Sequence, residues 1–135
     1  MNENALCAKA IEAMKTAYAP YSGFKVGAAL LCADGSVYTG CNIENAAFSP
    51  SVCAERTAVF KAVSEGKRTF ATLAVAGGEN GVIRGVFPPC GVCRQVLAEF
   101  CPPDFPVLLV TGEGTFEKVS LGSLLPIAFS LEKEV

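Results

Sequence analysis

Two cysteine-bearing stretches, Cys53-Ala54-Glu55 and Pro89-Cys90-Gly91-Val92-Cys93, constrain the fold of this chain more than any other feature. Each stretch lies at an expected helix start. A spacing of three places the sulfurs of Cys90 and Cys93 on one helix face, where the free N–H groups of the first turn lower thiol pKa values. Cys53 comes 37 positions before Cys90. If the three sulfurs bind one metal ion, the two helix starts have to lie side by side.

The set of possible ligands indicates a catalytic zinc ion. The chain contains no histidine, so a nitrogen ligand from imidazole is excluded. Three protein ligands without an obvious fourth are typical of catalytic zinc, because the open position holds water. Glu55 lies two residues after Cys53 and reaches that water only if the metal lies just beyond the helix start. A carboxylate placed there is suited to carrying protons rather than to binding the metal.

Five short motifs follow one another along the chain. They are Pro20-Tyr21-Ser22-x-Phe24, Gly40-Cys41-Asn42-Ile43-Glu44-Asn45, Cys53-Ala54-Glu55-Arg56-Thr57, Pro89-Cys90-Gly91-x-Cys93-Arg94-Gln95 and Leu124-Leu125-Pro126-x-Ala128-Phe129. Zinc-dependent deaminases share the signature H-x-E…P-C-x-x-C, in which cysteine replaces the histidine here. In this order the motifs resemble the small cytidine deaminases. The resemblance runs from about Leu6 to Ser130, and it implies a single catalytic domain over residues 1–135.

The resemblance implies a reaction and a cofactor. Members of this family hydrolyse cytidine and 2′-deoxycytidine to uridine and 2′-deoxyuridine with release of ammonia, a step of pyrimidine salvage. We therefore expect one Zn²⁺ per subunit on Cys53, Cys90 and Cys93, with Glu55 as the catalytic proton carrier. Members of this size are usually homotetramers, so a homotetramer is expected here too.

The resemblance also implies the substrate contacts. Asn42 and Glu44 match an Asn-x-Glu pair that binds the ribose 3′-hydroxyl, a role that suits one amide and one strong acceptor. Phe24 matches a ring that lies against the base, and the backbone of Ala54 matches a hydrogen-bonding partner of the base. Phe129 matches an aromatic side chain that reaches the next subunit's pocket. From the residues alone, a polar loop and aromatic core packing explain the same positions.

Arg56 and Arg94 lie close in sequence to the expected ligands. Three thiolates and Zn²⁺ sum to one net negative charge, which weakens the metal as a Lewis acid. Helix N-termini and arginine hydrogen bonds to sulfur offset that excess, and the resemblance implies this role for Arg56. For both arginines the alternative is a solvated surface charge. Phe48 also has two interpretations, core packing or the pocket of a neighbouring subunit.

Composition and charge narrow the class of partner. The 135 residues are 51% hydrophobic, which is typical of one ordinary domain with a buried core. The net charge is −2, without a run of like charges, so the sequence offers no electrostatic footprint for nucleic acid or an anionic membrane. The sequence lacks a membrane-span pattern and a recognisable signal peptide. We expect a cytoplasmic protein that acts on a small-molecule nucleoside.

The order of expected elements favours an α/β domain. We expect helices over 4–18, 49–65, 90–100 and 121–129, and strands over 24–32, 36–41, 70–77, 106–111 and 116–120. Ser49-Pro50-Ser51 marks the start of the second helix. The charged tail 131–135 is expected to be loose. The pattern predicts a three-layer α/β/α fold with a mixed five-stranded sheet, which resembles the cytidine deaminase fold.

Other interpretations fit parts of the pattern. A blasticidin-type or other nucleoside-analogue deaminase shares the Pro-Cys-Gly motif, although the intact Asn42-x-Glu44 favours an ordinary nucleoside. A structural zinc module needs a fourth ligand, for which Cys41 and Cys101 are the nearby candidates. A redox Cys-x-x-Cys protein needs a thioredoxin-like context, which this sequence lacks. A polynucleotide editor is disfavoured because the sequence has no basic groove signal.

Overall fold

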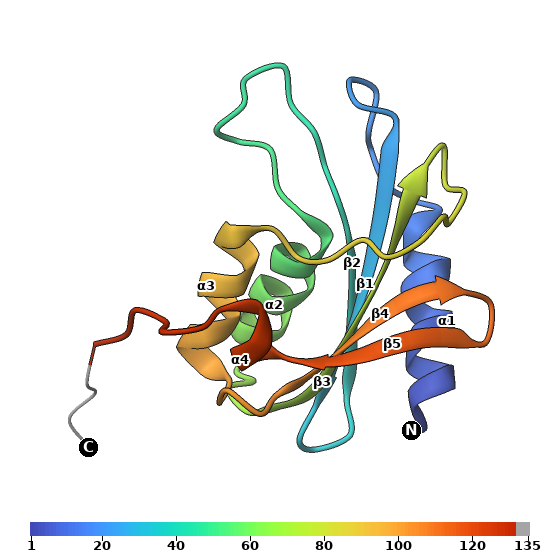
Figure 1. Ribbon diagram of the computed structural model, residues 1–135. Helices are drawn as coiled ribbons and strands as arrows, with labels where there is room; N and C mark the ends of the chain where they lie inside the picture. Colours follow the sequence, from blue (N-terminus) through green and yellow to red (C-terminus); the bar gives the residue numbers. More distant parts are fainter. Residues whose placement is uncertain (132–135) are drawn as a thin grey trace.

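The computed structural model describes residues 1–131, which form four helices and a five-stranded mixed sheet (Figure 1). The helices are α1 (Glu3–Met14), α2 (Ala54–Ser64), α3 (Gly91–Phe100) and α4 (Leu121–Leu124). The strands are β1 (Phe24–Cys32), β2 (Val37–Cys41), β3 (Phe70–Glu79), β4 (Pro106–Gly112) and β5 (Thr115–Ser120). They lie in the order β2-β1-β3-β4-β5, with β3 and β4 parallel and the other neighbours antiparallel.

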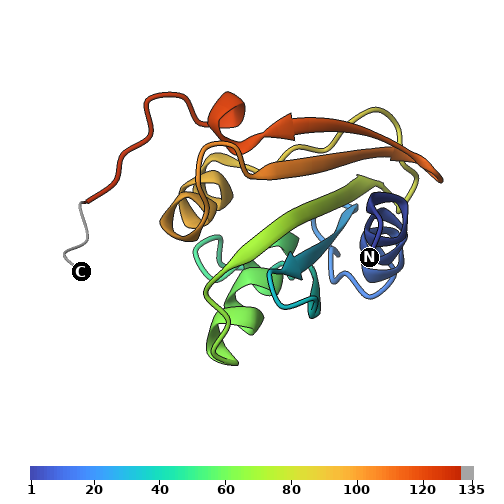
Figure 2. The same cartoon turned by 90° about the horizontal axis from the view of Figure 1, so that it is seen from below.

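Helices cover both faces of the sheet, which confirms the expected three-layer arrangement. Figure 1 shows α1 on one side of the sheet and α2 and α3 on the other, and Figure 2 keeps the same separation. Side chains of β3 alternate between the two interfaces: Leu73 and Val75 pack toward α2 and α3, whereas Ala74 and Ala76 pack toward α1. All four are buried because both faces of β3 are covered, so the strand has a continuous apolar sequence.

Gly40 in β2 allows α2 to lie directly on the sheet. A Cβ atom at this position would be 2.6 Å from the carbonyl oxygen of Ala54 and 2.6 Å from the amide nitrogen of Ala58. Both distances are well below van der Waals contact, so a larger residue would push the helix away. Gly40 therefore holds the first turn of α2 close to the end of β2.

α1 is shorter than expected and ends at Met14 rather than near Tyr18. Asn2 caps the helix, because its side-chain oxygen accepts a hydrogen bond of 2.7 Å from the N–H of Ala5 in the first turn. Beyond the helix, the N–H of Tyr18 donates to the carbonyl of Asn42 (3.0 Å), and the carbonyl of Tyr18 accepts from the N–H of Glu44 (2.8 Å). This pairing with a distant segment keeps Tyr18 out of the helix.

α2 begins at Ala54, later than the expected start at Ser49-Pro50-Ser51. Ile43 and Val52 exchange two backbone hydrogen bonds of 3.0 Å, which keep the chain extended up to the helix. The cap position therefore falls on Cys53, which has φ −80° and ψ 156°. The later start places the Cys53 sulfur at the open N-terminal end of the helix.

The last helix is also shorter than expected. α4 covers Leu121–Leu124 only, and Pro126, which lacks an N–H group, follows closely. Residues 125–131 run away from the body of the domain without regular structure (Figure 1). Of the charged tail, residues 132–135 lie outside the described part of the chain. Within residues 1–131, no helix has the length and apolar character that a membrane crossing requires.

Candidate active site

Three cysteine sulfurs meet where α2 and α3 begin. The Sγ atom of Cys90 lies 3.5 Å from that of Cys53 and 3.5 Å from that of Cys93, and all three sulfurs lie within 4.8 Å of one another. Cys53 is the N-cap of α2 and Cys90 is the N-cap of α3. The free N–H groups of two helix starts therefore direct partial positive charge toward the cluster.

The sulfur cluster fits a zinc ion. Sulfurs bound to Zn²⁺ at about 2.3 Å in tetrahedral geometry lie about 3.8 Å apart, close to the observed spacing. Thiolates are soft ligands that zinc prefers. Among residues 1–131, no further cysteine or carboxylate joins the cluster. Cys41 instead accepts a 3.6 Å hydrogen bond from Thr16, and Cys101 is buried in the core, so neither supplies the fourth ligand of a structural zinc module.

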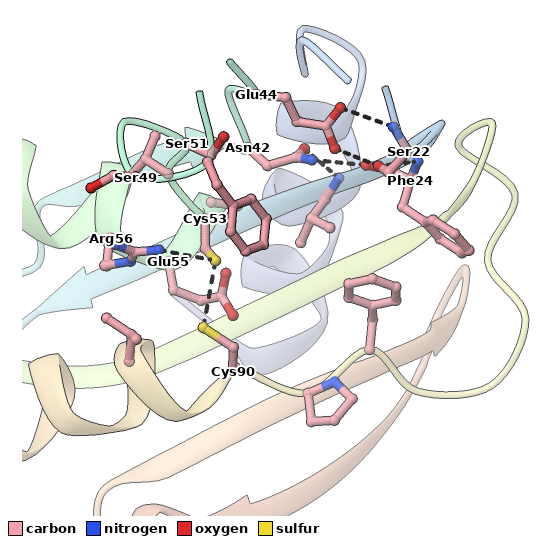
Figure 3. A pocket seen from close by; sticks show the side chains of 17 residues that line it. Ser22, Phe24, Asn42, Glu44, Ser49, Ser51, Cys53, Glu55, Arg56 and Cys90 are labelled. Carbon is pink, nitrogen blue, oxygen red and sulfur yellow. Dashed lines mark hydrogen bonds between the residues drawn. The ribbon is translucent and has the colours of Figure 1, made fainter. Parts of the chain in front are cut away.

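Arg56 lies beside the cluster, as the motif predicts. Its Nη2 atom lies 3.4 Å from the Sγ atom of Cys53, and Figure 3 shows this contact. Hydrogen bonding from Cys93 and from Arg56 lowers the pKa of the Cys53 thiol to about 5, against the opposing effect of burial. The Nε atom of Arg56 is buried without a hydrogen-bond partner. Arg56 thus supplies positive charge to the cluster at the cost of one unsatisfied donor.

Glu55 is the one charged residue in the described core. Its side chain is only 4% exposed, and its carboxylate lies next to Cys53 and Cys90 (Figure 3). Burial, with a smaller contribution from the neighbouring Cys53 thiolate, raises the pKa of Glu55 to about 7. A carboxyl group whose pKa lies near neutral pH can both accept and release a proton, which is what a proton carrier needs.

A cavity of about 610 Å³ opens beside the sulfurs, and its volume suits a small-molecule ligand. Cys53, Cys90 and Glu55 lie at one end, whereas Asn42 and Glu44 lie at the other (Figure 3). The buried backbone of Ala54, the first residue of α2, also lines the cavity. The structure thus brings the expected metal ligands, the proton carrier and the expected sugar contacts into one space.

Asn42 is held against the backbone of β1. Its Oδ1 atom accepts a hydrogen bond of 2.8 Å from the N–H of Val26, and its Nδ2 atom donates one of 2.8 Å to the carbonyl of Phe24. An amide side chain has two N–H groups, so these bonds leave one for a ligand. Asn42 therefore has a fixed orientation inside the cavity.

Glu44 is fixed by the loop before β1. Its carboxylate accepts hydrogen bonds from the backbone N–H groups of Tyr21 (3.0 Å) and Ser22 (3.1 Å) and from the hydroxyl of Ser22. The Ser22 hydroxyl, with these N–H groups, holds the pKa of Glu44 below its ordinary value. Glu44 is thus a carboxylate acceptor at the far end of the cavity from the sulfurs.

The three aromatic residues expected at the substrate pocket, Phe24, Phe48 and Phe129, lie on the surface of the chain rather than in its core. Phe24 is 41% exposed and lines the cavity, Phe48 is 95% exposed at its margin, and Phe129 is 69% exposed outside it. The core interpretation is therefore wrong for all three within one chain. Phe87 also lines the cavity, with its ring centroid 6.0 Å from that of Phe24. The sequence reasoning missed Phe87, and the available signal was its place three residues before Cys90.

Arg94 has a different role from either expected one. Its Nε atom donates to the carbonyl of Pro89 (2.7 Å), and its Nη1 atom donates to the carbonyl of Leu124 (2.6 Å). The side chain is half-buried, so it is not a solvated surface charge. Its bonds reach backbone carbonyls rather than a sulfur. Arg94 links the residue before Cys90 to the end of α4.

The fold and the site together define a class of zinc-binding deaminase domain. The family model described as "Cytidine and deoxycytidylate deaminase zinc-binding region" matches residues 1–109. A cytidine deaminase from Sporosarcina psychrophila is 52% identical over 132 residues, which cover 98% of this chain and 94% of that protein. The chain belongs to the cytidine and deoxycytidylate deaminase family.

Two crystal structures agree with this assignment. Cytidine deaminase from Burkholderia pseudomallei matches with a TM-score of 0.87 at 47% identity, over 96% of this chain and 100% of that one. Cytidine deaminase from Mycobacterium tuberculosis matches with a TM-score of 0.81 at 40% identity, over 97% of this chain and 99% of that one. The similarity therefore extends over nearly the whole length of both chains in each comparison.

Proposed function

We propose that this protein catalyses the hydrolytic deamination of cytidine and 2′-deoxycytidine. In each case the nucleoside and one water molecule give the corresponding uracil nucleoside and ammonia. The observation that carries the proposal is the position of Glu55, which is buried beside three cysteine sulfurs at one end of a nucleoside-sized cavity. Family membership supports the same reaction.

The residues of the chain divide the chemistry between them. Cys53, Cys90 and Cys93 would hold the zinc ion, which would make a water molecule acidic enough to serve as a nucleophile near neutral pH. Glu55 takes one proton from the attacking water and passes it to N3 of the pyrimidine ring as the water oxygen adds to C4. It then takes the second proton from that oxygen and delivers it to the amino group, so that the C4–N bond breaks, a carbonyl group forms at C4 and the nitrogen leaves as ammonia. A pKa near 7 matches this exchange.

Substrate binding uses the other end of the cavity. Asn42 donates its remaining N–H to the 3′-hydroxyl of the sugar, and Glu44 accepts a hydrogen bond from that hydroxyl. Because ribose and deoxyribose both carry a 3′-hydroxyl, both nucleosides are substrates. Phe24 packs against the base, and the backbone of Ala54 forms a hydrogen bond with it. The ordering of Asn42 and Glu44 by backbone groups lowers the entropic cost of these contacts.

The assembly and the setting form part of the proposal. The protein is a homotetramer in which Phe129 of one subunit completes the pocket of the next, which accounts for the exposure of Phe129 in a single chain. It acts in the cytoplasm, in pyrimidine salvage. Among the described residues, the absence of a fourth protein ligand supports a catalytic rather than a structural zinc ion.

An ultraviolet assay on zinc-loaded protein tests the proposal. Cytidine, 2′-deoxycytidine, cytosine and cytidine monophosphate are compared side by side. We expect loss of aminopyrimidine absorbance with both nucleosides, and with neither the free base nor the nucleotide. Turnover of the nucleotide alone would overturn the substrate assignment. If none of the four is converted while zinc is retained, an analogue deaminase of the blasticidin type replaces the proposal.

A further inference from the structure

Phe87 is an aromatic residue of the cavity to which the reaction assigns no part. It belongs to the loop between β3 and α3 and precedes the metal ligand Cys90 by three residues. Its side chain is half-buried and lines the cavity together with Phe24. The two ring centroids are 6.0 Å apart and the ring planes are inclined by 34°. Phe24 and Phe87 therefore form one continuous aromatic wall.

The Phe87 ring packs closely against β3 because the residue beneath it, Gly77, has no side chain. A Cβ atom at Gly77 would lie 2.8 Å from Cγ of Phe87, 3.0 Å from Cδ1 and 3.1 Å from Cβ. Glycine at this position is thus what allows the ring to rest on the strand. Gly77 pairs with Val26 of β1, which also lines the cavity. The ring is consequently packed against the sheet that forms this side of the cavity.

The direction of the base follows from the proton carrier, and this step rests on the proposed function. Glu55 gives a proton to N3, so the N3 edge of the pyrimidine faces the start of α2. C5 lies on the other side of C4 from N3. The start of α2 lies on one side of the sulfur cluster. The segment that leads into α3, which carries Phe87 and Cys90, lies on the opposite side and therefore faces C5. Figure 3 shows Phe24 on the side of the cavity away from Cys53 and Glu55.

We propose that Phe87 is a specificity-determining residue that contacts the C5 edge of the pyrimidine. With Phe24 it limits the size of the group that the cavity admits at C5. Hydrogen at that position fits against the ring, whereas a methyl group or a bromine atom crowds it. The protein therefore prefers unsubstituted cytosine nucleosides, and the preference depends on the bulk of Phe87.

Phe87→Val tests this inference through a ratio of rates. The quantity is kcat/KM for 5-methylcytidine and for 5-bromocytidine, each divided by kcat/KM for cytidine. The two substituents are similar in size and opposite in electronic effect, so a change shared by both reports on space. We expect both ratios to rise by about tenfold or more, because the fit of one methyl-sized substrate group in an apolar pocket usually changes kcat/KM by at least that factor. Unchanged ratios overturn the inference.

Val86→Ala is the matched control. Val86 neighbours Phe87 in the same loop, is 38% exposed and does not line the cavity. Shortening it should leave both ratios at their starting values. Equal rises in Phe87→Val and Val86→Ala would mean that loosening of the loop, rather than space at C5, sets the preference, and this result would also overturn the inference.

Gly77→Ala tests the position of the Phe87 ring from the side of β3 on which the ring rests. The added methyl group has no room, so it pushes Phe87 into the cavity, and both ratios should fall. In a Phe87→Ala background the contacts to Cγ and Cδ1 are absent and only the 3.1 Å contact to Cβ remains, so the fall should become smaller. If Phe87→Val loses its zinc, Phe87→Leu with a smaller expected rise replaces it. Unconverted cytidine in the parent protein refutes the proposed function, whereas converted cytidine with fixed ratios refutes only the role of Phe87.

Discussion

Burial raises the pKa of Glu55 to about 7, which suits the proton-carrier role proposed for it. The Glu55→Gln variant keeps the shape of the side chain but removes the exchangeable proton. We expect kcat/KM for cytidine to fall by about 10²–10⁴. Zinc content should stay unchanged, because Glu55 lies next to the sulfur cluster without being one of its ligands. Metal analysis and the ultraviolet assay on the same sample check both statements, and retained turnover would remove Glu55 from its role.

Arg56 lies 3.4 Å from the Cys53 sulfur and is expected to offset part of the negative charge of the three thiolates. Its removal takes away a hydrogen bond to Cys53 and a neighbouring positive charge. We expect Arg56→Ala to lower zinc affinity by about 10–100-fold, measured by competition with a chelator. Arg56→Lys restores the charge and should recover part of the affinity. Equal affinity in all three proteins would show that the contact with Cys53 is incidental.

The site residues that could be predicted from the sequence are those whose spacing is set by metal coordination and helix geometry. The three cysteines and Glu55 follow metal-site and helix geometry, so their meeting was predictable. Phe87 and Arg94 were not, because a side chain in a loop goes where tertiary packing leaves room. For Phe87 that room is made by Gly77, and for Arg94 it lies between Pro89 and α4.

At the scale of elements, α3 is joined to the C-terminal segment by two neighbouring side chains. Arg94 binds the carbonyl of Leu124, and Gln95 donates a hydrogen bond of 3.0 Å to the carbonyl of Phe129. Since Arg94 also binds the carbonyl of Pro89, one residue connects the start of the metal-binding helix with α4. The two ends of this connection are thus fixed by charge-assisted bonds to backbone.

Arg94→Ala should therefore loosen the domain more than it affects the metal. We expect the free energy of unfolding to fall by about 1.5–3 kcal/mol, the range for hydrogen bonds to a charged group. Zinc affinity should fall less than in Arg56→Ala, because Arg94 reaches carbonyls rather than sulfur. Denaturant unfolding checks the first statement, with the exposed Arg84→Ala as control. A fall in zinc affinity as large as that of Arg56→Ala, with an unchanged free energy of unfolding, would contradict this role of Arg94.

Asp34 gives the β1–β2 hairpin a dependence on pH. Its carboxylate lies 2.7 Å from the amine of Lys67 and accepts two hydrogen bonds from Ser36. The hydrogen bond from Lys67, with those from Ser36, holds the pKa of Asp34 well below its ordinary value of 3.8. Because the pKa is lower in the folded state, the contribution to stability is present above 3.8 and is lost as the pH falls below it.

We expect Asp34→Asn to be less stable than the parent near neutral pH and to approach it in acid. The effect is small because the pair is exposed to solvent. The measurement is thermal unfolding of both proteins at a series of pH values from neutral to below the ordinary pKa of aspartate. The exposed Asp104→Asn variant changes the net charge equally and serves as control. A difference that grows in acid would contradict the assignment of Asp34.

Element boundaries marked the limit of reasoning from the sequence. The five expected strands agree with β1 to β5 to within about two residues at each end. The expected start of α2 and the expected end of α1 were wrong because backbone pairing between distant segments decided them, and the expected end of α4 was wrong because the helix stops before Pro126. The bridge between Ile43 and Val52 is the clearest case, since it delays α2 and so makes Cys53 its cap.

For the molecule as a whole, the exposure of two aromatic residues is consistent with the proposed homotetramer. Phe129 is 69% exposed and Phe48 is 95% exposed, unusual values for phenylalanine in a finished surface. In the proposed homotetramer, Phe129→Ala removes a contact that one subunit makes to its neighbour's pocket. We expect KM for cytidine to rise by about tenfold, the effect of losing roughly 1.4 kcal/mol of binding.

Light scattering and kinetics on the same samples separate the outcomes. The parent protein should have the mass of four chains, and Leu131→Ala, on the same exposed segment, should behave like it. A monomeric parent protein with full activity would contradict both the assembly and the role of Phe129. The hydrophobic pattern of one chain predicts its own helices and strands. It does not predict a pocket shared between chains, because the pattern contains no information on which surfaces of two chains meet.

The placement of the three sulfurs also bears on how the chain reaches its native state. Cys53 and Cys90 are 37 positions apart, so an ion that joins them closes a loop that includes α2 and β3. The free energy of such binding counts toward folding, because an unfolded chain does not present the three sulfurs together. We therefore expect zinc supply during synthesis to affect the yield of native protein as well as its activity, and a chelator to lower the free energy of unfolding.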